Sequence, residues 1–140
     1  LCDIPLLRVE EMYFNVIECK FYLEGLAAGK QALESFLNTY RYTNSGYYCD
    51  ATYNADFMYE MIAQKFIEFW GEGVLYNDFK RLRLAVIRDY VGSNYLEAYL
   101  LNSKDGYCAP WLNFYIPETE RSFNSALENE MNPDPTPYCE

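Results

Sequence analysis

Two carboxylates, Glu72 and Asp78, lie six residues apart around Gly73, and enzymes use paired carboxylates for general acid–base catalysis. The chain contains no histidine, which excludes His-based zinc sites and Ser-His or Cys-His relays. Acidic side chains beside a glycine bend also stabilise helix ends through the helix dipole, and we expect this second role here. We therefore expect Glu72 and Asp78 to have no catalytic role.

Metal and thiol chemistry find little support. Residues 102–106, NSKDG, lack the ligand alternation and the distal Glu of a calcium loop. The five cysteines include no CxxC pair, so no zinc knuckle or thioredoxin-like motif is present. Cys19 lies in a predicted helix and is expected to be buried, whereas Cys49 and Cys108 lie in predicted loops and could pair in an oxidising compartment. We expect no metal and no cofactor.

Aromatic residues make up 19% of the chain, which has 15 Tyr. Sugar rings stack on Trp and Tyr, and loops can present such rings to solvent. The alternative is that Trp111 and its neighbours anchor the C-terminal segment to the helices, which is the commoner role for such rings. The candidate ligand-binding residues are Trp111, Tyr107, Tyr47 and Tyr48.

The formal net charge of -10 argues against nucleic acid as a partner, because phosphate binding depends on clustered Lys and Arg. The basic cluster of Lys80, Arg81, Arg83 and Arg88 falls in the second half of a predicted helix, where cations complement the helix dipole. No stretch approaches the roughly 20 apolar residues of a membrane span. A start at Leu1 suggests a mature form or a fragment of a longer protein.

Helical spacing of apolar residues predicts a first hairpin over about 8–42. Its helices run over 8–23 and 30–40, with a turn over 26–29 after the stop signal of Gly25. The apolar face of the first helix is predicted to comprise Val9, Met12, Tyr13, Val16 and Ile17. That of the second is predicted to comprise Ala32, Leu33, Phe36, Leu37 and Tyr40.

A second hairpin is predicted over about 55–89, after an exposed loop over 43–54. Its helices are expected over 57–70, capped by Asn54 or Asp56, and from Asn77 or Asp78 onward. Their apolar positions are Met58, Ile62, Phe66 and Phe69, then Leu75, Phe79, Leu82 and Val86. Two such hairpins in one domain predict a mainly α fold with tetratricopeptide-like hairpins.

The remaining segment, 90–140, is predicted to be irregular. A short helix is expected around 95–101, a strand over 111–116 and one or two helical turns over 117–127. The proline-rich tail over 132–140 is expected to be extended or disordered.

Three sequence blocks, in order, resemble the C-terminal part of the SusD/RagB-like family of Bacteroidetes outer-membrane nutrient-binding lipoproteins. The blocks are DIPLLRVEEMYFNVIECK at 3–20, FIEFWGEGVLYNDFKRLR at 66–83 and WLNFYIPETERSFNSAL at 111–127. The residues that match the family pattern are Arg8, Glu11, Tyr13 and Glu18, then Glu72, Gly73, Tyr76, Asp78, Lys80 and Arg81, then Ile116, Pro117, Glu120 and Asn124. Leu75 stands where the family commonly has Arg, so the corner at Glu72 is expected to be held more by packing than by ion pairs.

The resemblance implies a non-catalytic protein that captures oligosaccharide or peptide and caps a SusC-like TonB-dependent transporter. It implies surface exposure on the outer membrane, with a lipid anchor on a segment outside this chain, and contacts with the remainder of the full-length protein. This chain would supply mostly helical scaffold. The alternative is a stand-alone helical-repeat adaptor that binds another protein.

Overall fold

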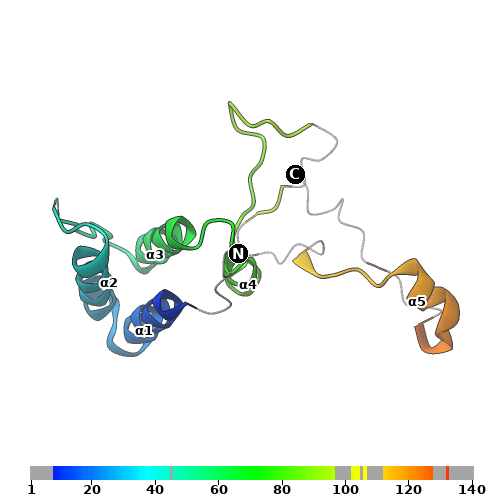
Figure 1. Ribbon diagram of the computed structural model, residues 1–140, viewed down its shortest axis with the longest axis horizontal. Coiled ribbons are helices and arrows are strands. Elements are labelled where there is room, and N and C mark those ends of the chain that lie inside the picture. The colour runs from blue at the N-terminus through cyan, green and yellow to red at the C-terminus, as the bar shows by residue number, and fades with distance from the viewer. Residues whose placement is uncertain are drawn as a thin grey trace, which may run out of the picture. The chain divides into compact units, whose positions relative to one another are not determined.

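Five α-helices and a 3-10 helix occupy most of the described chain, which comprises residues 8–44, 46–96, 102–104, 106, 112–127 and 132 of the computed structural model (Figure 1). A mainly α fold is therefore confirmed, and the described residues contain no strand. The chain divides into two compact units, 1–72 and 73–140, which are described separately. The elements are α1 (Val9–Glu24), α2 (Leu26–Tyr40), α3 (Asn54–Glu68), α4 (Leu75–Leu82), α5 (Glu118–Phe123) and the 3-10 helix η3 (Ser125–Leu127).

In the first unit, one residue, Gly25, joins α1 to α2. Its φ of +94° lies in a region that L side chains rarely adopt, and its N–H donates to the carbonyl of Phe21 at 3.0 Å. The chain therefore reverses at this residue, and the two helices pack along each other (Figure 1). The predicted turn over 26–29 is wrong, because Leu26 already begins α2 and a single glycine suffices for the reversal.

The core of this unit is largely aromatic. Phe14 packs edge-on against both Phe36 and Phe69, with ring centroids 5.3 and 6.0 Å apart. Phe21 stacks on Phe57 of α3 at 4.8 Å. Such ring pairs add to the free energy gained by burying their area, so they hold the three helices together.

Gly29 lets the helices approach closely. A Cβ atom built at Gly29 would lie 2.8 Å from Cβ of Phe21 and 2.9 Å from the ring of Phe57. A glycine inside a helix costs stability relative to alanine, and close packing of three helices is the compensation here.

The face of α1 that packs on the core differs from the predicted one. Of the five predicted residues, only Ile17 is buried; the core also receives Phe14 and Phe21. Because α1 carries apolar residues on two opposite sides, spacing alone permits either choice, and the two phenyl rings bury the larger area. The predicted residues that are exposed instead are Val9, Met12, Tyr13 and Val16.

The other predicted core positions are partly correct. In α2, Leu33, Phe36 and Leu37 are buried, whereas Ala32 is half-buried and Tyr40 is half exposed. Helix α3 begins at Asn54, so its N-cap is Tyr53 and not Asn54 or Asp56 as predicted. Asp56, at the third helical position, still binds the N-cap by accepting a hydrogen bond from the N–H of Tyr53 at 3.1 Å. In and after α3, Ile62 and Phe69 are buried, Met58 is half-buried and Phe66 is exposed.

Residues 46–52 form an extended strap, in which Gly46, Tyr48, Asp50 and Thr52 are exposed, as predicted for the loop over 43–54, whereas the alternate residues are not. Cys49 and Ala51 are buried, and three α2 side chains spaced four residues apart bind the strap backbone. Asn38 bonds both the N–H and the carbonyl of Tyr47, at 2.5 and 2.9 Å. Glu34 accepts from the N–H of Cys49 and Lys30 donates to the carbonyl of Ala51, both at 2.9 Å. Four residues of α-helix rise about 6 Å, and two residues of extended chain span about 6.6 Å. Every fourth residue of α2 therefore lies beside every second residue of the strap.

Helix α4, in the second unit, is shorter than predicted. It ends at Leu82 because Arg83 adopts a left-handed conformation, with φ of +54°. The carbonyl of Arg83 accepts from the N–H of Gly106 at 2.9 Å, and Val86 pairs with Ser103 in an isolated antiparallel bridge. The prediction that Val86 and Arg88 belong to this helix is therefore wrong. A second hairpin over 55–89 is not confirmed, since α3 and α4 fall in different units.

The predicted strand over 111–116 is not formed by its described part, residues 112–116. Tyr76 donates to the carbonyl of Leu112, which is buried, and Asn132 bonds both backbone groups of Ile116 at 2.8 and 2.9 Å. With these side-chain partners the segment needs no neighbouring strand. Helical turns over 117–127 are confirmed by α5 and η3. Tyr95 and Leu96 are not helical, while 97–101 and 133–140 lie outside the described residues.

Candidate functional site

Two of the four predicted ligand-binding residues can be placed. Trp111 and Tyr107 lie outside the described residues. Tyr48 lies on the strap with 75% of its surface exposed, and the ammonium group of Lys30 lies 5.5 Å from its ring centroid. An exposed ring of this kind can stack on a ligand, so Tyr48 is retained as a candidate.

Tyr47, next to it, is half-buried and anchors the strap. Its hydroxyl donates to Glu60 of α3 at 2.5 Å, and its ring stacks on Tyr42 with centroids 5.4 Å apart. Desolvation, together with the hydrogen bond to Glu60, raises the pKa of Tyr47 above its ordinary range. These contacts indicate a structural role for its hydroxyl.

The first and second sequence blocks meet in an ion-pair cluster. Arg8 donates to Glu72 at 2.6 Å, to the carbonyl of Glu68 at 3.0 Å and to the carboxylate of Glu68. Its guanidinium also lies 5.1 Å from the ring centroid of Phe69. The expectation that packing rather than ion pairing holds the corner at Glu72 is therefore wrong: Arg8, distant in sequence, supplies the cation.

Glu68 is the centre of this cluster, with only 7% of its side chain exposed. Arg41 contacts both of its carboxylate oxygens, each at 2.5 Å. The hydrogen bond to Glu72 raises the pKa of Arg8, and that to Glu68 raises the pKa of Arg41. Both guanidinium groups therefore stay charged, and the cluster fixes the start of α1, the end of α2 and the end of α3 relative to one another.

Other residues of the second and third blocks make local contacts. Gly73 has φ of +77°. Asp78 is buried and pairs with Arg81, three residues on, at 2.7 Å. Pro117 caps α5, its carbonyl accepts from the N–H of Glu120 at 3.0 Å, and Glu120 accepts from Asn124 at 3.1 Å. These contacts stabilise the ends of α4 and α5.

Glu18, a matched residue of the first block, lies half-buried on α1.

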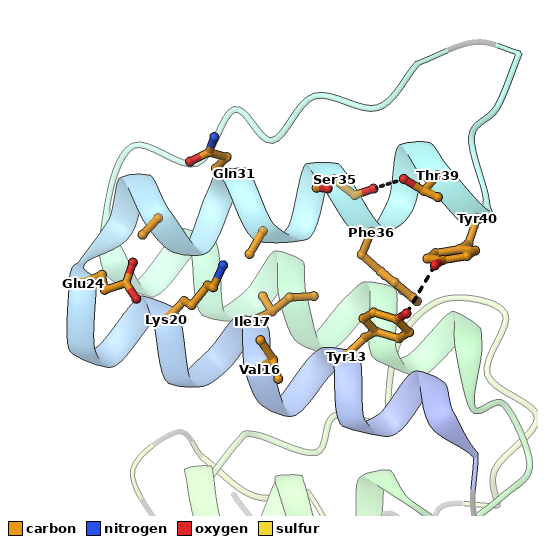
Figure 2. A pocket seen from close by; sticks show the side chains of 12 residues that line it. Tyr13, Val16, Ile17, Lys20, Glu24, Gln31, Ser35, Phe36, Thr39 and Tyr40 are labelled. Carbon is orange, nitrogen blue, oxygen red and sulfur yellow. Dashed lines mark hydrogen bonds between the residues drawn. The ribbon is translucent and has the colours of Figure 1, made fainter.

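A groove of about 470 Å³ runs between α1 and α2. Figure 2 shows Tyr13, Val16 and Lys20 of α1 on one side and side chains of α2 on the other. At one end Tyr13 stacks on Phe36 at 5.1 Å, and its hydroxyl lies 3.2 Å from that of Tyr40. This hydrogen bond raises the pKa of Tyr13. The full lining is Tyr13, Val16, Ile17, Lys20, Glu24, Ala28, Gln31, Ala32, Ser35, Phe36, Thr39 and Tyr40.

The groove can bind a ligand through rings, small apolar surfaces and hydroxyl or amide groups. Sequence reasoning missed it because Tyr13, Val16 and Tyr40 were assigned to the buried faces. The available signal was that α1 carries more apolar positions than one helix face can hold.

Cys19 is exposed, contrary to prediction, and Cys49 is buried; both are free thiols. Cys108 lies outside the described residues. Within the described part of the chain, no group of three or more His, Cys, Asp or Glu side chains is arranged to hold a metal ion. None of the helices described has the length and apolar character needed to cross a membrane.

Comparison of the chain with protein-family models, with curated proteins and with solved structures found no match in any of the three.

Proposed function

We propose that this chain is the C-terminal, mostly helical part of a SusD/RagB-like nutrient-binding protein of the outer membrane. The protein captures an oligosaccharide or a peptide and delivers it to a SusC-like TonB-dependent transporter. It is non-catalytic and lipid-anchored through a segment outside this chain.

The observation that carries the proposal is the contact of Arg8 with Glu68 and Glu72. Arg8 comes from the first block that resembles the family and the two glutamates come from the second, 60 and 64 residues later. The first block therefore contacts the start of the second block, residues 66–72, within the first unit, and this contact supports a common scaffold.

The chemistry of the remaining matched residues agrees with a scaffold role. Asp78 and Arg81 pair with each other, and Pro117 and Glu120 organise the first turn of α5. The acidic residues Glu72 and Asp78 thus each pair with an arginine, as expected for structural charges and not for an acid–base couple.

The proposal is tested on intact cells that carry this sequence, with an antibody raised against the chain. Added protease should cleave the protein, and metabolic labelling with a palmitate analogue should mark it. A periplasmic protein of the same cells, which should resist the protease, is the control. A protein that is neither cleaved nor labelled would instead be consistent with an intracellular helical adaptor.

The ligand class is tested with the intact protein on glycan and peptide arrays. Tyr48→Ala should weaken binding if the strap contributes to the ligand site, whereas Tyr53→Ala, at an equally exposed tyrosine, should not. Equal binding by both variants would remove Tyr48 from the site and leave Trp111 and Tyr107 as candidates.

A further inference from the structure

The strap has a second edge, which α2 does not bind. Neighbouring residues of an extended chain direct their N–H and C=O groups to opposite edges. The groups of Tyr47, Cys49 and Ala51 therefore share the edge that makes four hydrogen bonds to side chains of α2. The groups of Tyr48 and Asp50 point to the other edge, which we call the outer edge.

The outer edge has no strong partner among the residues that the structure describes. The N–H and C=O groups of Tyr48 and the N–H group of Asp50 make no hydrogen bond there. The carbonyl of Asp50 accepts only from the hydroxyl of Thr52, at 3.5 Å, a distance at which hydrogen bonds are weak. Because buried backbone groups nearly always have partners, and because Tyr48 and Asp50 are exposed residues, these groups are open to solvent.

Helix α3 does not cover the outer edge. The side chains of an extended chain stand perpendicular to its two edges. On one face of the strap, Cys49 and Ala51 are buried, and the hydroxyl of Tyr47 reaches Glu60 of α3 at 2.5 Å. Helix α3 therefore lies under this face and α2 lies along the inner edge, so the outer edge is directed away from α2.

The occupant that fits such an edge is another extended polypeptide. The outward groups recur every two residues, or about 6.6 Å, which is also the repeat of an extended peptide backbone. An unpaired edge of this kind binds an added strand through main-chain hydrogen bonds. A helix has its backbone groups bonded internally, and a glycan lacks this alternation of N–H and C=O groups, so neither supplies the matching row.

The exposed face of the strap indicates which side chains the peptide should carry. Tyr48 exposes 75% of its surface, and the carboxylate of Asp50 follows two residues later on the same face. In an antiparallel pair, an aromatic ring opposite Tyr48 and a Lys or Arg opposite Asp50 are the favourable neighbours. An antiparallel peptide in which Phe follows Lys by two residues provides both.

We propose that the outer edge of the strap binds a linear peptide, which adds to residues 48–50 as an antiparallel strand. The inference rests on the proposed function, in which oligosaccharide and peptide are the two ligand classes, and it selects peptide at this site. Its test uses the purified chain, so peptide binding can fail while surface exposure and lipid labelling on cells succeed, and the reverse.

The probe is a fluorescent seven-residue peptide with blocked ends, Thr-Thr-Lys-Thr-Phe-Thr-Thr. Fluorescence anisotropy should detect saturable binding to the 140-residue chain, with a dissociation constant below about 1 mM. Two analogues test the binding mode with unchanged side chains. N-methylation of Lys and Phe, whose N–H groups face the strap, should weaken binding at least about tenfold, because two hydrogen bonds are lost. N-methylation of the two Thr residues that follow Lys and Phe, whose N–H groups face away, should leave binding unchanged.

Asp50→Pro tests the same edge from the side of the protein. Proline removes the outward N–H, which has no partner in the described part of the chain, and it is compatible with an extended edge. The variant should therefore stay folded by circular dichroism and bind the peptide at least about fivefold more weakly. Asp50→Asn, which keeps the N–H and removes the charge, is the matched control and should bind more tightly than Asp50→Pro.

The proposal would be overturned by absence of saturable peptide binding, or by equal effects of the two N-methylated analogues. It would also be overturned if folded Asp50→Pro bound the peptide as well as Asp50→Asn did. If Asp50→Pro unfolds, the pair of analogues decides the question with the wild-type chain. Loss of glycan binding, with peptide binding unchanged, in Tyr48→Ala would assign the strap to an oligosaccharide instead.

Discussion

At the scale of single residues, the ion-pair cluster around Glu68 joins two arginines to a largely buried carboxylate of the first unit. A carboxylate with 7% exposure loses most of its hydration, and Arg8 and Arg41 together replace it. Removing one partner of a buried pair leaves an uncompensated charge, which costs more than the pair itself contributes.

Arg8→Met is therefore expected to lower the free energy of unfolding by about 2 to 3 kcal/mol, as measured by urea denaturation. Arg41 remains beside Glu68 in this variant, which keeps the loss below that of a fully orphaned charge. Lys20→Met, which removes a cation from the exposed groove wall, is the control and should change stability by less than about 0.5 kcal/mol. A similar loss in both variants would mean that net charge, not the cluster, is responsible.

Glu10 makes the stability of the first unit depend on pH in the acid range. A hydrogen bond from its own backbone amide, and then its contact with Arg8, lower the pKa of Glu10 below 4.5. A carboxylate whose folded pKa is lowered stabilises the fold above its unfolded pKa, and this stabilisation disappears as the pH falls through the folded pKa. In urea denaturation at pH values from 6 to 3, Glu10→Gln should flatten the decline of stability below pH 4.5. An unchanged slope would exclude this contribution.

At the scale of elements, the strap shows how an irregular segment is held without a sheet. Lys30, Glu34 and Asn38 lie on one side of α2 and match the alternate residues of the strap. The backbone groups of a buried extended chain need partners, and here helix side chains supply them.

Asn38→Ala should remove both hydrogen bonds to Tyr47 and free the strap at that end. We expect a loss of about 1 to 2 kcal/mol and faster amide hydrogen exchange over residues 46–52. Thr39→Ala, whose hydroxyl donates only within α2, to the carbonyl of Ser35, is the neighbouring control. Equal exchange in both variants would show that the buried Cys49 and Ala51 suffice to hold the strap.

Gly29→Ala tests the close contact of the helices. Alanine gains about 1 kcal/mol in helix propensity, but its Cβ would overlap Phe21 and Phe57 at 2.8 to 2.9 Å. Overpacking typically costs about 1 to 3 kcal/mol, so a net loss of up to about 2 kcal/mol in the free energy of unfolding is expected in thermal or urea unfolding. Gln31→Ala, at an exposed position of α2, is the control. A stabilised Gly29→Ala protein would mean that the helices separate easily.

At the scale of the whole molecule, the division after Glu72 assigns the phenylalanine core, the strap and the Arg8 cluster to the first unit. A fragment of residues 1–72 therefore contains its own core and is above the size at which small domains usually need added cross-links. It should show a helical circular dichroism spectrum and a cooperative thermal transition. A fragment without such a transition would mean that residues 73–140 are required for folding.

The helical character of the chain, the positions of α1 and α3 to within a few residues, and the helical turns after Pro117 follow from the sequence. Apolar spacing and capping residues act over a few positions, so they can be recognised locally. Gly25 could likewise be recognised as a helix terminator from the local sequence alone. In contrast, α4 ends at Leu82 because its next residue bonds to Gly106, a partner that local spacing does not reveal.

The candidate site was harder to predict from the sequence than the helices, because its residues are brought together by tertiary contacts. Tyr48 is exposed as predicted from its loop position, but the hydroxyl of Tyr47 is bound by Glu60, a residue of another helix. Tyr13 and Tyr40 form one end of a groove only because α1 and α2 align.

The sequence by itself determined that the chain forms helices, that it contains no histidine and that its formal net charge is -10. Only the tertiary structure decided which face of α1 is buried and which cation pairs with Glu72. The physical reason is that both faces of α1 are apolar and that Arg8 lies 64 residues before Glu72 in the sequence. The choice is made by the shape of the aromatic core and by contacts between residues about sixty positions apart.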